Sequence, residues 1–209
     1  MRPAILVVRF SSLGDIILTS ATLLNLKISY PDHHLIYLTK EEYRAVVKLF
    51  DSVDEIVTLT GDSLSSYIPL LLRLRARNIK LVVDLHGNPR SFLARRMTKS
   101  EKAVMYPKHR IDRARMVSKH GKKLPEEWPH TIDNYNECMN QLKIPVVSCR
   151  PVIRVGNKLS QNGENDRPTV LFSPGASFDT KKIEVEKLVR VATALYREHN
   201  AHIIWAATS

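Results

Sequence analysis

Apolar runs alternate with amphipathic segments along the first hundred residues. Residues 4–10 (AILVVRF) form a continuous apolar run, which is typical of a strand buried on both faces of a parallel sheet. A helical spacing of apolar residues follows over 16–30 and stops at Pro31. The same cycle then repeats, with strands predicted at 35–39, 55–59, 80–86 and 103–106 and helices at 41–50, 64–78 and 90–97. This alternation predicts an α/β fold with a Rossmann-like parallel sheet.

The second half of the chain begins a new unit. Residues 107–130 are read as a long loop or a polar helical segment, and residues 132–142 as a helix. After a polar linker at 156–167, a strand at 169–172, a helix at 185–200 and a strand at 202–207 are predicted. We therefore expect a first domain at 1–155, a linker at 156–167 and the truncated start of a second domain at 168–209. So short a unit cannot bury both faces of a sheet, which favours a fragment over extra strands docked on the first domain.

The charge of the chain is concentrated in one segment. Lys and Arg number 32 against 21 Asp and Glu, a formal net charge of +11. Residues 90–123 hold 12 basic and 2 acidic side chains, so +10 of that charge lies there. A uniformly basic, histone-like protein is excluded. The pattern predicts one cationic face for an anionic partner such as a phosphate, a lipid head group or a nucleic acid, with a solvated face as the alternative.

Composition excludes several other classes of protein. There is no G-x-G dinucleotide fingerprint and no P-loop, and two cysteines suit neither a four-thiolate zinc site nor a disulfide framework. We expect no metal and no cofactor. The apolar start of the chain is too short for a signal peptide core, and no run approaches the ~18 apolar residues of a membrane span. The predicted location is the cytoplasm, free or peripheral to a membrane.

The turn after the first predicted strand lies where open α/β sheets bind ligands. It contains Ser11, Ser12, Gly14 and Asp15. Gly14 would let a substrate approach the backbone, and Asp15 would place a carboxylate in the crevice. Because Ser12-x-x-Asp15 also fits a helix-capping box, the residues alone leave catalytic base and helix cap as equal alternatives.

Two further segments carry candidate binding groups. The loop 173–182 follows a buried strand and supplies the hydroxyls of Ser177 and Thr180 and the amine of Lys181, which are the parts of a phosphate site or of an ordinary solvated loop. The end of the fourth predicted strand and the basic stretch after it offer candidate substrate-binding residues, although a structural role at the strand end is favoured for His86. These are His86, Asn88, Arg90, Arg110 and Arg113.

Three segments together resemble glycosyltransferase family 9, the lipopolysaccharide heptosyltransferases. AILVVRFSSLGDIILTSATLLNLKISYPDHHLIYLT is similar to the opening of that family, with its S-x-L-G-D turn. VVDLHGNPRSFLARRM is similar to the D-L-x-G-x-x-R-S segment. SPGASFDTKKIEVEKLVRVATAL is similar to the P-G-A-S-x-x-T-K-x-W-P segment that opens the second domain, although Ile183-Glu184 replaces its W-P.

The resemblance implies a two-domain transferase of the GT-B type with its active site between facing Rossmann-like domains. The expected reaction is an inverting, metal-independent transfer of heptose from ADP-heptose to a Kdo-bearing lipid A acceptor at the inner membrane. By motif match, Asp15 takes the place of the general base. Ser177 and Lys181 take the places of residues that bind the donor pyrophosphate, where lysine would stabilise the ADP leaving group. The replaced W-P leaves open which of Lys181 and Lys182 faces the phosphate.

Other functions remain as alternatives at this stage. The chain could be a non-catalytic acceptor-binding remnant, or a transferase that uses another nucleotide sugar. A nucleic-acid-binding α/β protein would also explain the basic stretch, but the flanking motifs weigh against it and we expect no nucleic-acid partner. Because the segments that would hold the base and the sugar are absent, we expect little or no activity from this chain alone.

Overall fold

The computed structural model describes residues 2–61, 63–108, 129–154, 167–175, 179 and 182–206. The chain divides into two compact units, residues 1–155 and 156–209. The predicted linker at 156–167 lies outside the described residues except for Arg167.

The first unit is built on a parallel sheet of five strands. These are β1 (Ala4–Val8), β2 (His34–Lys40), β3 (Glu55–Leu59), β4 (Ile79–Asp84) and β5 (Lys102–Met105). Their order is β3-β2-β1-β4-β5, and every neighbouring pair is parallel. The central strand β1 is buried along its whole length, as its apolar run requires. The Rossmann-like parallel sheet predicted from the sequence is confirmed.

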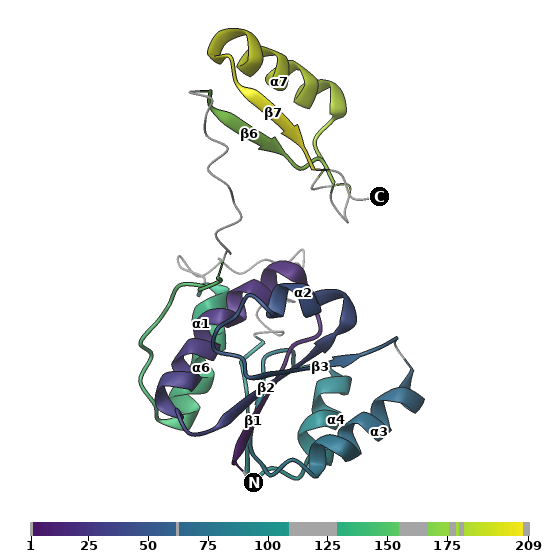
Figure 1. The fold of residues 1–209 in the computed structure, drawn as a ribbon, viewed down its shortest axis with the longest axis vertical. Coiled ribbons are helices and arrows are strands. Elements are labelled where there is room, and N and C mark those ends of the chain that lie inside the picture. The colour runs from purple at the N-terminus through teal and green to yellow at the C-terminus, as the bar shows by residue number, and fades with distance from the viewer. Residues whose placement is uncertain are drawn as a thin grey trace, which may run out of the picture. The chain divides into compact units, whose positions relative to one another are not determined.

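Helices cover both faces of this sheet (Figure 1). One face packs against α1 (Leu13–Ser29), α2 (Arg44–Val47) and α6 (Thr131–Leu142). The other packs against α3 (Leu64–Arg75) and α4 (Pro89–Met97). The two layers explain why β1 lacks the apolar–polar alternation of a strand with one solvated face.

Several predicted elements differ from the structure in their bounds, among them the strand expected at 4–10, which ends at Val8, and the helix expected at 64–78, which ends at Arg75. The helix expected at 41–50 is a 3-10 turn, η1 (Glu41–Tyr43), followed by the single α-helical turn of α2. The strand expected at 80–86 ends at Asp84. It ends there because the Asp84 carboxylate accepts hydrogen bonds from the backbone N–H groups of His86 (2.9 Å) and Gly87 (2.7 Å), which turn the chain.

A buried asparagine fixes the chain after α6 to α1. Asn25 is fully buried, and its side-chain oxygen accepts hydrogen bonds from the backbone N–H groups of Val147 (2.9 Å) and Ser148 (2.8 Å). Its amide donates to the backbone oxygen of Ser148 (2.9 Å). Farther along, the backbone N–H of Val152 donates to the hydroxyl of Ser20, also on α1 (2.9 Å). The segment that leads toward the second unit is therefore held along α1.

The second unit contains β6 (Thr169–Phe172), α7 (Val185–His199) and β7 (His202–Trp205). The two strands pair in parallel, and the rings of Phe172 and Trp205 stack with centroids 4.9 Å apart. Large apolar side chains remain uncovered here, including Leu171 at 63% and Trp205 at 46% exposure. In neither unit does a described helix have the length and apolar character needed to cross a membrane.

Candidate active site

Asp15 lies in the first turn of α1, directly after β1 and so at the carboxyl edge of the sheet. Arg9 leaves the end of β1, and its guanidinium forms an ion pair with Asp15 (Nη2–Oδ2, 2.6 Å). The Arg9 side chain is 8% exposed, whereas that of Asp15 is 34% exposed. The carboxylate is therefore paired with a buried cation and remains partly accessible to solvent.

Hydrogen bonds fix both oxygens of this carboxylate. The Ser12 hydroxyl donates to Oδ2 at 3.0 Å, and the Ser12 backbone N–H donates to the same oxygen at 3.4 Å. The hydroxyl of Tyr135, from α6, donates to Oδ1 at 3.3 Å. Asp15 therefore caps α1, which is one of the two roles that the sequence offered as alternatives. Its role as a catalytic base stays a prediction.

Competing effects set the protonation of Asp15. Burial raises the pKa of its carboxyl group. The Arg9 charge and the hydrogen bonds from Ser12 and Tyr135 act in the opposite direction. The balance lowers the pKa below its ordinary value. Asp15 is therefore ionised at neutral pH, which is the form that accepts a proton.

Arg9 and Tyr135 are site residues that the sequence analysis missed. Arg9 also donates to the backbone oxygen of Leu85, and its guanidinium lies 5.5 Å from the centre of the Tyr135 ring. Arg9 could have been found because it is a charged residue inside an otherwise apolar run, and a buried arginine is almost always paired. Tyr135 gave no such signal, because it reaches Asp15 only through the packing of α6 against α1.

His86 lies at the same edge of the sheet, after β4. Its ring packs edge-to-face against Phe10, with centroids 5.4 Å apart. Burial, followed by the charges of Arg9 and Lys108, lowers the pKa of His86 to about 4. Its Nδ1 atom is buried and has no hydrogen-bond partner among the described residues. His86 is thus a neutral imidazole at neutral pH, within electrostatic reach of Asp15.

The neighbouring candidates support the start of α4. The Asn88 side-chain oxygen accepts a hydrogen bond from the backbone N–H of Ser91 (2.8 Å), so Asn88 caps the helix. The Arg90 guanidinium lies 5.9 Å from the centre of the Tyr67 ring, and the Tyr67 hydroxyl donates to the backbone oxygen of Arg90 (2.9 Å). These contacts give both residues a local structural role and leave acceptor binding as a prediction.

Gly14 and Ser11 lie beside Asp15, as their places in the turn require. A Cβ built on Gly14 would meet no atom within 4 Å. The protein itself therefore has no steric need for glycine at this position. The remaining predicted site residues lie outside the described residues, and they are Arg110, Arg113, Ser177, Thr180 and Lys181.

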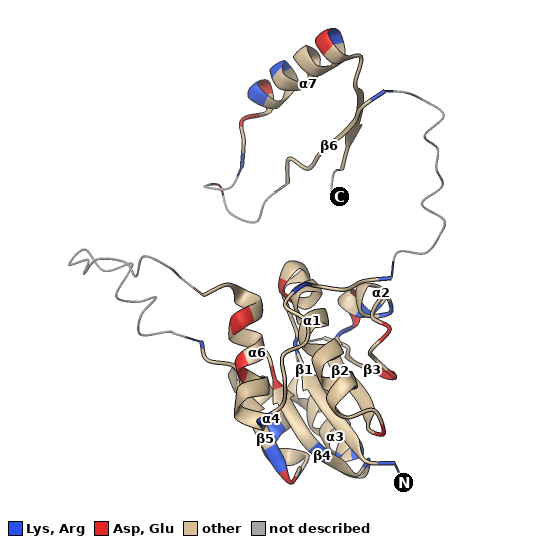
Figure 2. Cartoon of the chain, turned by 90° about the vertical axis from the view of Figure 1, so that its left-hand side faces the viewer, with Lys and Arg blue, Asp and Glu red and all other residues tan. Residues whose placement is uncertain are grey.

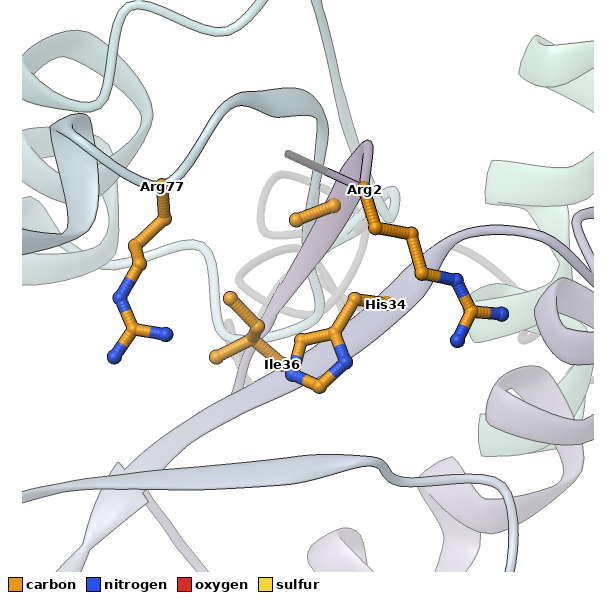
Figure 3. Close-up of a pocket in the computed structure, with 5 residues that line it drawn as sticks. Arg2, His34, Ile36 and Arg77 are labelled. Atoms are coloured by element: carbon orange, nitrogen blue, oxygen red, sulfur yellow. The ribbon is translucent and has the colours of Figure 1, made fainter.

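A separate pocket lies at the opposite, amino edge of the sheet. Arg2, Arg77 and His34 line it, together with Ala4 and Ile36 (Figure 3). Arg77 forms two hydrogen bonds with Glu55 (2.9 and 3.0 Å), and His34 contacts the same carboxylate (3.1 Å). Arg2 donates to the backbone oxygen of Pro31 (2.8 Å). Because its polar groups are occupied, this pocket is a weaker candidate than the partly exposed carboxylate of Asp15. No group of three or more possible metal ligands occurs among the residues that the structure describes.

The fold of the chain, with its Rossmann-like parallel sheet, is shared with glycosyltransferases of the GT-B type. The similarity to a family 9 glycosyltransferase from Veillonella parvula has a TM-score of 0.75 at 20% identity, over 98% of this chain and 62% of that one. For the ADP-heptose lipopolysaccharide heptosyltransferase II of E. coli the TM-score is 0.73 at 18% identity, over 97% and 63%. For E. coli heptosyltransferase WaaC with ADP it is 0.69 at 16% identity, over 99% and 67%.

These similarities establish the fold expected from the family 9 resemblance. No family model and no curated protein sequence matches the chain. The chain spans less than two thirds of the length of the first two of these structures.

Proposed function

We propose that this chain belongs to an inverting glycosyltransferase that moves heptose from ADP-heptose to the lipopolysaccharide inner core. The observation that carries the proposal is the ionised, partly exposed carboxylate of Asp15 at the ligand-binding edge of a sheet whose fold is shared with heptosyltransferases. The nucleotide and the sugar are taken from what those solved structures are reported to bind or use.

In the proposed reaction, Asp15 removes the proton from an acceptor hydroxyl as its oxygen attacks the anomeric carbon of the sugar. The new carbon–oxygen bond forms while the bond to the ADP oxygen breaks, and the configuration inverts. Arg9 and Tyr135 hold the carboxylate in one orientation. Because its pKa is lowered, Asp15 is ionised and able to accept a proton, but it is a weak base. Substrate that displaces water from the exposed side of the carboxylate would raise its basicity.

The donor side of the proposal rests on the loop 173–182. Ser177, Thr180 and Lys181 would bind the pyrophosphate, and lysine would stabilise the charge that develops on ADP without a metal ion. Lys182 forms an ion pair with Asp179 (2.7 Å). That pairing favours Lys181 as the lysine that faces the phosphate.

The acceptor side of the proposal rests on charge. His86, Asn88 and Arg90 lie after β4, between the carboxyl edge of the sheet and the first turn of α4, and the basic stretch 90–123 continues from there. A phosphorylated, Kdo-bearing lipid A acceptor would supply the complementary negative charge. We place the protein in the cytoplasm, peripheral to the inner membrane that carries such an acceptor.

A non-catalytic acceptor-binding module is the second candidate. It is favoured by the second unit, where apolar side chains such as Leu171 and Trp205 lie exposed. With these surfaces uncovered, we expect the 209-residue chain to turn over little donor by itself.

The decisive comparison uses two matched aspartates. Asp15→Asn should reduce ADP release from ADP-heptose in the presence of lipopolysaccharide core acceptor by roughly 10²–10⁴-fold, as for loss of a general base. Asp133→Asn is the control, since Asp133 occupies the equivalent first-turn position of α6, where it accepts a hydrogen bond from the backbone N–H of His130 (3.1 Å).

Equal turnover by the Asp15 variant and the wild type would contradict the proposed base. Acceptor binding with no turnover at all in the wild type, not even the low level expected of this chain, would instead identify the chain as a binding module.

A further inference from the structure

Helix α3 carries a second apolar stripe on its exposed side. Tyr67, Leu71 and Leu74 form its buried face. Leu64, Ile68 and Leu72, spaced four residues apart, are 57%, 40% and 49% exposed. Residues at this spacing share one side of a helix. Within the described residues nothing covers this stripe, although a surface helix of a globular protein ordinarily exposes polar side chains.

Helix α4 adds an exposed aromatic residue set among cations. Phe92 is 49% exposed, and the guanidinium carbons of Arg95 and Arg96 lie 5.5 and 5.6 Å from the centre of its ring. A hollow of about 340 Å³ adjoins it, which is large enough for a phosphate head group. The residues that line this hollow are Phe92, Arg95, Arg96, Lys99, Ser100 and Ala103. Since α3 and α4 cover the same side of the sheet, the stripe and the hollow belong to one helical layer (Figure 1).

The layer is strongly cationic. The sequences of α3 and α4 contain five arginines and no acidic residue. Blue segments, which mark Lys and Arg, lie beside the α4 and β5 labels in Figure 2. Arg95 forms an ion pair with Asp84 (3.2 Å). Among the described residues, Arg73, Arg75 and Arg96 have no acidic partner. Their charge is therefore available to an external anion.

We infer that the exposed side of α3 and α4 binds the surface of an anionic lipid bilayer. We call this surface the α3–α4 face, and it comprises Leu64, Ile68, Leu72, Arg75, Phe92 and Arg96. Leucine, isoleucine and phenylalanine would enter the boundary between head groups and acyl chains, and the arginines would bind lipid phosphates. A nucleic acid would be bound by cations and stacked aromatic rings. The aliphatic stripe therefore favours a lipid surface over a nucleic acid as the partner.

This inference deepens the proposed function, because it rests on an acceptor that is carried in a membrane. It also changes where the membrane contact is expected. The charge count pointed to residues 90–123, whereas the apolar groups that can enter a bilayer lie mostly on α3, before that stretch begins.

The test is co-sedimentation of the full chain with vesicles that lack lipopolysaccharide. The wild type should bind phosphatidylcholine vesicles containing about 40% phosphatidylglycerol and should not bind vesicles of phosphatidylcholine alone. Arg75→Glu with Arg96→Glu should weaken this binding by about tenfold or more, since each basic residue near such a surface contributes about 1 kcal/mol. Leu72→Ser with Phe92→Ser should weaken it as well, and that loss should persist at low salt.

The matched control is Lys48→Glu with Lys143→Glu. It changes the net charge equally at exposed positions next to α2 and α6, on the other side of the sheet. Thermal unfolding verifies that every variant is folded. Equal loss of binding in the face and control variants would overturn the inference, as would unchanged binding in both face variants or equal binding of the wild type to neutral vesicles.

The outcome is independent of the proposed chemistry. Vesicle binding that requires the α3–α4 face, together with a lack of glycosyl transfer, would retain this inference and reject the enzyme. Transfer to a soluble acceptor without vesicle binding would retain the enzyme and reject this inference. Binding of the wild type to duplex DNA at physiological salt, in place of vesicles, would assign the face to a nucleic acid instead.

Discussion

Arg9 and Asp15 form a 2.6 Å ion pair across the turn that joins β1 to α1. The arginine is almost completely buried and the carboxylate is partly open to solvent. A buried cation that faces an accessible anion keeps the anion charged and directed outward. The protonation of the candidate base therefore depends on an arginine that is packed into the first unit.

Removing Arg9 should raise the pKa of Asp15. In Arg9→Met, burial would act on the carboxyl group without the opposing charge, so the acidic limb of the pH–rate profile should move to higher pH. Arg44→Met, which breaks the exposed ion pair of Arg44 with Glu41, is the control. An unchanged acidic limb in the Arg9 variant would contradict the assignment of Asp15 as the base.

The same ion pair should contribute to the dependence of stability on pH. Because the folded-state pKa of Asp15 is lowered, its contribution is present above the unfolded value of about 3.9 and is lost as the pH falls through the folded value. Arg9→Met should lack this contribution, and unfolding curves measured at neutral pH and near pH 3 should reveal the difference.

His86→Gln should make stability less dependent on pH in mildly acidic solution. The folded pKa of about 4 lies below the unfolded value of about 6.5, so the unfolded state binds more protons between them and stability falls as the pH drops. At pH 5 the wild type should lose at most about 2 kcal/mol from this residue. Denaturant unfolding at pH 7 and pH 5 measures the loss, with His33→Gln as a control. Equal pH dependence in the wild type and the His86 variant would be inconsistent with a buried neutral imidazole.

Asp84→Ala should destabilise the first unit strongly. The fully buried carboxylate accepts hydrogen bonds from the backbone N–H groups after β4 and from the Ser91 hydroxyl (2.8 Å), and it pairs with Arg95. Its loss leaves buried donors and a cation without a partner, so the free energy of unfolding should fall by about 3 kcal/mol or more. Asp51→Ala removes only an exposed ion pair with Arg154 and should cost less than about 1 kcal/mol. Similar losses in the free energy of unfolding for the two variants would contradict the role of Asp84 in stabilising the turn.

Lys181→Met and Lys182→Met should separate the two lysines of the donor loop. Lys182 is paired with Asp179, so its replacement should leave donor affinity nearly unchanged. Lys181→Met should weaken the binding of ADP, measured by calorimetry, by about tenfold or more, since a charge-assisted hydrogen bond to phosphate contributes about 1.5–3 kcal/mol. The opposite order of effects would assign the phosphate to Lys182.

The sequence was most informative where local pattern and burial agree. The strands of the first unit and the helices α1, α4 and α6 appear close to their predicted bounds, because their apolar spacing matches the layers that cover them. The fourth strand was predicted too long, because a side chain, Asp84, ends it by capturing backbone donors. Apolar periodicity carries no information about such a hydrogen bond.

The candidate site was predictable only in part. Asp15 could be found because the strand, the turn and the helix that place it are contiguous in the sequence. Tyr135 could not, because its hydroxyl reaches Asp15 through the tertiary packing of α6. Asp84 lies inside a motif that the sequence singled out, yet its structural role follows from its burial, which the motif does not specify.

Helix α1 contacts both the start of the first unit, at Asp15, and its last described segment, at residues 147–152. Its first turn carries Asp15, and farther along the helix Asn25 and Ser20 hold the backbone at residues 147, 148 and 152. Tension applied at Arg154 would meet its backbone hydrogen bond to Leu49 (2.7 Å) first and the contacts of residues 147–152 with α1 next. A pull on the end of the first unit would thus act on the same helix that positions the carboxylate of Asp15.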